Sequence, residues 1–208
     1  AVESTMKPGI KWADMHRLAE RTILEHLVKN DFVRLNGQTI EYLHLTLHIP
    51  ALFMPHGLGH FVGLDTHDVG GYPPGVERVN EPGIKKLRTG RVLEKNMVIT
   101  VEPGLSFIEA LLVPAMADPK LAPHFNAEKL KRFMNFGGVR LEDDVIVTET
   151  GCENMTKVPR SVEEVEKVMA EGLASQDAIH FLFKELDPAL TKAKHTHHAG
   201  CAHSNGVA

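Results

Sequence analysis

One glycine-rich segment that carries histidines restricts this chain more than any other part of it. His56 and His60 each lie beside a glycine in His56-Gly57-Leu58-Gly59-His60, and His67 follows next to Asp68. Because glycine lacks a side chain, backbone in such a loop can approach a ligand closely. A histidine in this setting can be a simple turn residue, but three imidazoles at fixed spacing indicate a metal or proton-transfer site.

Two acidic residues further along the chain strengthen this interpretation. Glu102 ends an apolar run and precedes Pro103-Gly104, and Glu142 lies in Val139-Arg140-Leu141-Glu142-Asp143-Asp144. Each glutamate alone could be a surface charge at the end of a strand. One histidine with carboxylates forms a hard ligand set, which suits Mn²⁺, or Zn²⁺ and Co²⁺ in hydrolysis, better than copper or iron–sulfur chemistry.

The composition excludes several classes of protein. The chain has 208 residues, of which 43% are hydrophobic and 24% charged, enough for one sizeable core. A net charge of −4 with both signs interspersed predicts no nucleic-acid or membrane partner, so a small-molecule partner is expected. With no signal-peptide pattern and only Cys152 and Cys201, we expect a cytoplasmic protein with free thiols.

The first half of the chain contains one clear helical pattern. Apolar residues recur at helical spacing over residues 12–29, and we expect His16 and His26 to be partly exposed on that helix. Residues 43–49 alternate as in a strand, although Leu43 and Leu47 would also share a helix face. In the strand interpretation His44 and His48 face solvent.

The second half predicts a long functional loop followed by strands. Residues 70–91 are rich in glycine, proline and charge, which is typical of a loop over a site. Residues 98–101 predict a buried strand. Residues 139–148 predict another, in which Arg140 and Glu142 share a face and the guanidinium lies beside the carboxylate.

The carboxyl-terminal part predicts helices and a polar tail. Residues 161–169 indicate a short closing helix, and residues 174–194 could form another amphipathic helix. Residues 194–208 are polar and rich in histidine. Such a tract can bind metal, but a frayed tail is the simpler interpretation.

The ordered motifs resemble those of prolidases, the Xaa-Pro dipeptidases among the pita-bread metallopeptidases. The resemblance runs from about Met6 to about Ala170. It implies an α+β pita-bread catalytic domain, incomplete at its amino-terminal side, over residues 1–170, with an extension over residues 171–208. The segments that carry the resemblance are residues 53–68, 72–78, 87–89, 100–104 and 136–144.

The same resemblance implies a role for each candidate residue. His60, Glu102 and Glu142 are expected to be metal ligands of a two-ion site that holds manganese, with zinc or cobalt possible. His67 would contact the substrate and stabilise or protonate the tetrahedral intermediate, with Asp68 as its partner. His56 is expected in the substrate pocket.

Two arginines complete the expected site. Arg88 resembles the arginine that receives the free carboxylate of a carboxy-terminal proline, which would limit the substrates to dipeptides. Arg140 would orient Glu142 through an ion pair. The expected partners are therefore Xaa-Pro dipeptides, and the family implies a homodimer.

One part of the family's ligand set is missing from this sequence. Prolidases also use two aspartates on a hairpin that precedes the region matching Lys7-Pro8-Gly9, and no aspartate stands there. We therefore expect a carboxy-terminal fragment that is inactive or nearly so alone, with a sheet edge and apolar surface uncovered.

Other functions of the same fold are open at this point. An Xaa-Pro aminopeptidase or a methionine aminopeptidase would use a similar ligand set, although residues 72–78 and Arg88 favour a prolidase. A non-catalytic binding module of the same fold would not need His60, His67, Glu102 and Glu142 together.

Overall fold

The structure is a computed structural model, and it describes residues 1–174. The chain separates into two units, residues 1–156 and residues 157–208, which are treated separately here. The expected helix over residues 174–194, the histidine-rich tail and Cys201 lie outside the described residues. The domain boundary expected near residue 170 stays a prediction.

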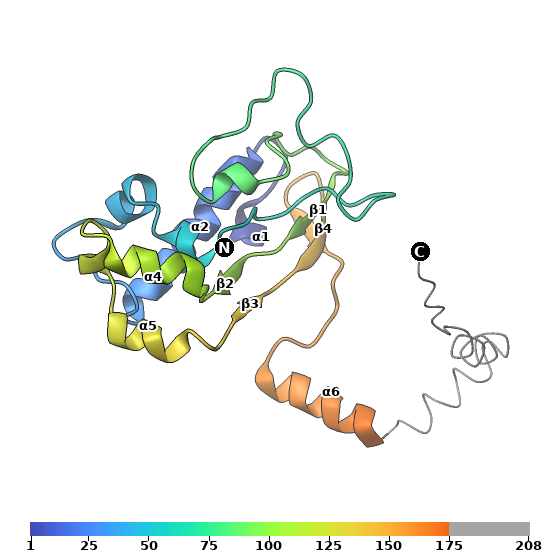
Figure 1. Ribbon diagram of the computed structural model, residues 1–208. Helices are drawn as coiled ribbons and strands as arrows, with labels where there is room; N and C mark the ends of the chain where they lie inside the picture. The colour runs from blue at the N-terminus through green and yellow to red at the C-terminus, as the bar shows by residue number, and fades with distance from the viewer. Residues whose placement is uncertain (175–208) are drawn as a thin grey trace, which may run out of the picture. The chain divides into compact units, whose positions relative to one another are not determined.

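The first unit contains a three-stranded and a two-stranded antiparallel sheet (Figure 1). Strand β1 (Val98–Val101) pairs with β4 (Asp143–Val147), and β5 (Cys152–Asn154) adds to the other side of β4. Strand β2 (Gly104–Ser106) pairs with β3 (Gly138–Arg140). The same two stretches of chain therefore run side by side twice, with a break between the two ladders.

Helix α2 (Trp12–Lys29) has the bounds that its apolar spacing predicts. Asp14 in its first turn and Lys29 in its last turn complement the helix dipole. Trp12, at its start, is fully buried in a core with residues of β1 and β4. A second core packs around Phe53 and Phe107. Helix α2 contributes residues to both cores and so connects them.

The remaining elements are short helices. They are α1 (Val2–Thr5), the π-helix η1 (Tyr42–Thr46), α3 (Pro50–Phe53), the 3-10 helix η2 (Ile84–Lys86), α4 (Glu109–Ala117), the 3-10 helix η3 (Ala122–His124) and α5 (Ala127–Phe133). Residues 70–91 hold only η2, as expected for a long loop. Among residues 1–174, no helix is both long and apolar enough to cross a bilayer.

The second unit contains α6 (Val162–Ala174), which confirms the closing helix and extends it beyond residue 169. Ser161 caps its first turn, because its hydroxyl oxygen accepts a hydrogen bond from the amide of Glu164 at 3.2 Å. The Glu164 carboxylate in turn accepts from the amide of Ser161 at 3.1 Å. These reciprocal bonds determine where the helix begins.

Two expectations about histidines are wrong. Residues 43–49 form no strand; η1 occupies most of them, and His44 is buried rather than solvated. His16 is fully buried on α2, whereas His26 is exposed as expected. His48 is half-buried. The cause is a buried carboxylate, Glu20, which lies within ion-pair distance of both His16 and His44.

Candidate metal centre and substrate cavity

The segment that contains His60 runs antiparallel beside β1. The amide of Thr100 donates to the carbonyl of His60 at 2.9 Å, and the amide of Glu102 donates to the carbonyl of Leu58 at 2.7 Å. The Thr100 hydroxyl also accepts from the His60 amide at 2.9 Å and lies 3.1 Å from Oε1 of Glu102. Backbone pairing and this hydroxyl therefore set His60 and Glu102 against each other.

Glycine is required where this segment meets the strand. A Cβ on Gly59 would lie 1.8 Å from the carbonyl oxygen of Thr100, which no side chain can tolerate. A Cβ on Gly104 would lie 2.7 Å from Nε2 of His56. Both glycines let the histidine-bearing segment approach the sheet closely, as the glycine-rich pattern predicts.

The break between the two ladders brings the acidic residues together. Val101 pairs with Asp143 and Gly104 pairs with Arg140, so Glu102 and Glu142 both lie in the interruption between the paired strands. One ligand atom from each of His60, Glu102 and Glu142 lies within 4.8 Å of the others. His60 and Glu102 are buried, whereas Glu142 is exposed. The structure thus brings together the residues that the sequence nominates as metal ligands.

The tautomer of His60 suits a metal ligand. Its Nδ1 lies 2.9 Å from the carbonyl oxygen of Phe61 and, since a carbonyl only accepts, Nδ1 carries the proton. Nε2 then presents its lone pair and lies 3.2 Å from Oε1 of Glu102. A ring nitrogen with a lone pair beside two carboxylates fits a divalent cation.

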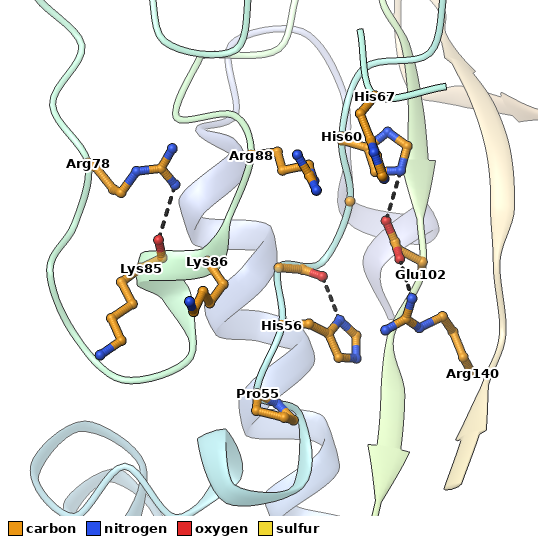
Figure 2. Close-up of a pocket in the computed structure, with 12 residues that line it drawn as sticks. Pro55, His56, His60, His67, Arg78, Lys85, Lys86, Arg88, Glu102 and Arg140 are labelled. Carbon is orange, nitrogen blue, oxygen red and sulfur yellow. Dashed lines mark hydrogen bonds and ion pairs between the residues drawn. The ribbon is translucent and has the colours of Figure 1, made fainter. Parts of the chain in front are cut away.

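Arg140 pairs with a different glutamate from the one expected. Its Nη1 donates to Oε2 of Glu102 at 3.0 Å (Figure 2), in place of the predicted ion pair with Glu142. The reason is the break at residues 141 and 142, which ends β3 at Arg140 and removes the shared strand face. The guanidinium faces Glu102 across the ladder instead.

His67 lies against His60 rather than beside its expected partner. The two imidazole rings meet edge to face, with their centroids 4.4 Å apart. Asp68 is turned towards Gly63, where a Cβ would meet Oδ2 at 1.9 Å. His67 therefore borders the candidate metal ligands directly.

His56 lines the same cavity as His60 and His67. Its Nδ1 lies 2.8 Å from the carbonyl oxygen of Gly57, so that Nδ1 donates and Nε2 accepts. Burial lowers the pKa of the imidazole; the bond to Gly57 opposes this, and the positive charge of Arg140 adds to it. A neutral ring is therefore favoured here.

A cavity of about 580 Å³ joins the candidate site residues. Figure 2 shows Arg88 on the loop opposite His60 and His67, with Lys86 and Arg78 from the same loop. The cavity is lined by all the predicted site residues except Glu142. These lining residues are His56, His60, His67, Arg88, Glu102 and Arg140. Cations thus face the candidate metal ligands across this cavity.

Comparison with known proteins agrees with the predicted family and fold. The model of metallopeptidase family M24 matches residues 1–149, and the chain belongs to that family. It has the pita-bread fold. The predicted resemblance to the carboxy-terminal part of prolidases is confirmed. The chain is 59% identical over 169 residues to the Xaa-Pro dipeptidase of Rattus norvegicus and 55% identical over 170 residues to that of Homo sapiens.

The matches cover most of this chain but a minor part of each relative. The alignments take 81% and 82% of the chain and 34% of each dipeptidase. Among solved structures, the aminopeptidase PepP of Pseudomonas aeruginosa aligns with a TM-score of 0.59 at 32% identity. That alignment covers 84% of this chain and 32% of PepP.

Two residues that support the site were not identified from the sequence. Thr100 bridges His60 and Glu102, and its position two residues before Glu102 in a strand was a usable signal, since both side chains point to one face. Trp12 donates from Nε1 to the carbonyl of Gly59 at 3.3 Å. No local pattern could have indicated that contact.

Proposed function

We propose that this chain supplies part of the active site of a metal-dependent Xaa-Pro dipeptidase. The observation that carries the proposal is the group formed by His60, Glu102 and Glu142 at one side of a cavity whose other side holds Arg88. High identity to two Xaa-Pro dipeptidases supports the same substrate class.

His60, Glu102 and Glu142 would hold the metal. When bound, a divalent ion in such a hydrolase lowers the pKa of a water molecule and polarises the scissile carbonyl. Arg140 would hold Glu102 in position, because its guanidinium donates a hydrogen bond to the carboxylate. Two oxygen ligands beside one nitrogen support manganese as the metal.

Substrate binding would rest on Arg88 and the two further histidines. The Arg88 guanidinium would receive the carboxylate of the terminal proline, which fixes the depth of the scissile bond relative to His60. His67 would donate a proton or hydrogen bond to the oxygen on which charge develops. His56, neutral and with Nε2 as an acceptor, would contact the substrate from the other side.

Hydrolysis of glycyl-proline with added Mn²⁺ tests the proposal. Because the resemblance implies two aspartate ligands besides these three, we compare the 208-residue chain with a chimera in which it replaces the matching segment of the rat dipeptidase. We expect cleavage by the chimera and little or none by the chain alone. Activity of the chain alone would mean that other residues complete the ligand set.

Matched variants of the chimera assign the role of the ligands. His60→Asn should abolish cleavage, whereas Glu149→Gln, which removes an exposed partner of Lys95, should leave it unchanged. A folded chimera that cleaves no Xaa-Pro dipeptide would contradict the proposal and favour a non-catalytic module. Full activity of His60→Asn would contradict the ligand assignment.

An Xaa-Pro aminopeptidase is the second candidate, because PepP of Pseudomonas aeruginosa is an aminopeptidase and aligns with the fold. The two activities differ in whether a residue follows the proline. A dipeptidase prefers a free proline carboxylate opposite Arg88, so glycyl-proline should be cleaved much faster than glycyl-prolyl-alanine. Cleavage of both at similar rates would favour the aminopeptidase.

We also propose a homodimer in the cytoplasm. The dimer is supported by the resemblance to prolidases, and the compartment by the scarcity of cysteine, with two in 208 residues. Light scattering of the chimera should give the mass of two chains. A monomer that is active would contradict the proposed assembly.

A further inference from the structure

A buried carboxylate lies outside the candidate metal centre, on the middle of α2. Glu20 is 1% exposed and is surrounded by potential cations. Oε1 lies 3.1 Å from Nε2 of His16, while Oε2 lies 3.0 Å from Nε2 of His44 and 2.8 Å from Nη1 of Arg17. We call Glu20, His16, Arg17 and His44 the Glu20 cluster.

The Glu20 carboxylate stays ionised in spite of its burial. Removal from water raises the pKa of the Glu20 carboxyl, but interactions with His16, His44 and Arg17 outweigh burial and bring the pKa down to about 2. A buried ion pair costs desolvation energy and is weak evidence for added stability. The position of the Glu20 cluster relative to the cavity is therefore more informative about its role than its contribution to stability.

One arm of the cluster reaches the loop that carries Arg88. Arg17 donates from Nη2 to Oε2 of Glu81 at 2.5 Å, so its guanidinium joins Glu20 to Glu81. A Cβ on Gly83 would lie 2.5 Å from Oε1 of Glu20, and Gly83 has φ +75°, which favours glycine. Residues 81–83 therefore pack directly on the carboxylate.

The contact of residues 81–83 with Glu20 holds the start of η2, which carries the cations on one side of the cavity. The amide of Lys85 donates to the carbonyl of Glu81 at 3.0 Å, and that of Lys86 donates to Gly83 at 2.9 Å. Lys85 and Lys86 line the cavity, and Arg88 follows them. The loop from Glu81 to Arg88 is thus anchored at its first residues.

The same cluster also supports the wall that carries the histidines. His44 belongs to η1, which precedes α3, and α3 leads into Pro55 and His56 at the cavity. Ala51 of α3 lies against Gly83, at 3.0 Å from where a Cβ would stand. The Glu20 cluster therefore contacts both the loop that leads to Arg88 and the elements that lead to His56.

We propose that Glu20 is a positioning residue that sets, through Arg17, Glu81 and Gly83, the distance between Arg88 and the candidate metal ligands. This proposal rests on the proposed dipeptidase function. It makes Glu20 responsible for how well a free proline carboxylate is received, although Glu20 touches no substrate. Loosening the anchor should weaken binding of that carboxylate without altering the metal ligands.

Glu81→Gln in the chimera is the most direct test. Glu81 is partly exposed, so this variant weakens the ion pair between Arg17 and Glu81 and leaves the buried contacts of Glu20 in place. We expect KM for glycyl-proline to rise by roughly three- to tenfold, as for loss of one charge pair, with kcat little changed. Glycyl-prolinamide has no carboxylate, so its kcat/KM should not change.

Two further variants separate positioning from general destabilisation. Gly83→Ala forces a methyl group against Glu20 and should reproduce the rise in KM. Glu25→Gln removes the exposed pair between Arg21 and Glu25 on the same helix, and should leave KM unchanged. Equal losses for glycyl-proline and its amide would overturn the proposal, because they would indicate a structural effect on the whole site.

Hydrogen exchange in the 208-residue chain gives a readout that does not depend on activity. In Glu81→Gln the amides of Lys85 and Lys86 should exchange faster, while the amide of Val147, bonded to Met97 in the sheet, should not. Unchanged exchange and unchanged KM would overturn the positioning role alone. A chimera that cleaves no Xaa-Pro dipeptide before mutation would overturn the proposed function and this inference with it.

Discussion

Acid should destabilise this protein through Glu20, and Glu20→Gln should remove that sensitivity. The pKa of the folded carboxyl is about 2, against an ordinary value of 4.5, because its interactions with His16, His44 and Arg17 outweigh burial. The difference, 4.5 − 2, is about 2.5 pH units. At ~1.4 kcal/mol per unit, ionisation of Glu20 makes the fold about 3 to 4 kcal/mol more stable at pH 7 than at a pH where the carboxyl is protonated in both the folded and the unfolded state.

The sign follows from the direction of the shift. Since the folded pKa is depressed, the stabilisation is present above the unfolded value of about 4.5 and is lost as the pH falls towards 2. Between pH 5 and pH 3 the loss should be about 2 kcal/mol. Gln cannot titrate, so the variant should lack this component, although it is less stable at pH 7.

Urea unfolding of the 208-residue chain at pH 7, 5 and 3 measures the effect. Trp12 is the single tryptophan and is fully buried, so its fluorescence reports unfolding of the core. The free energy of unfolding should fall by about 2 kcal/mol more in the unmutated chain than in Glu20→Gln between pH 5 and pH 3. Glu25→Gln should behave as the unmutated chain. Equal losses in both Glu20 forms would refute the reasoning.

Three further predictions concern the candidate site. Gly59→Ala places a Cβ 1.8 Å from the carbonyl oxygen of Thr100, and should lower the free energy of unfolding in urea by about 2 kcal/mol or more; an unchanged value would contradict the close approach. Arg140→Met removes the ion pair to Glu102 and should weaken metal binding by about 10- to 100-fold in a chelator competition, whereas unchanged affinity would exclude an orienting role. Burial lowers the pKa of His56, so its NMR titration midpoint should lie below 6.5; a higher midpoint would contradict the neutral ring.

Local sequence patterns predicted the elements whose partners are simple apolar surfaces. Residues 12–29 form α2 because one apolar stripe packs on the core, and residues 98–101 form β1 because both faces are buried. The candidate ligands His60, Glu102 and Glu142 were found because their motifs are long and ordered. Their proximity depends on a ladder break that the sequence marks with Pro103.

The buried polar contacts could not be predicted in the same way. His16 precedes Glu20 by four residues on α2, but this spacing is equally common on exposed helix faces and does not predict burial. His44 is 24 residues from Glu20 in the sequence, so no local pattern indicates their contact. The alternation over residues 43–49 did not produce a strand: within residues 1–174 no strand pairs with this segment, and Leu43 is buried in the core from η1. Arg140 was assigned to Glu142 because residues 139–148 were expected to form one strand, whereas β3 ends at Arg140 and β4 begins at Asp143.

The preference of the chimera for a free proline carboxylate tests the account most directly. We would measure kcat/KM for glycyl-proline and for glycyl-prolinamide, in the unmutated chimera and in Arg88→Met. The account predicts a strong preference for glycyl-proline that Arg88→Met removes, with the rate on the amide unchanged. A preference that survives in Arg88→Met, or no preference in the unmutated chimera, would contradict it.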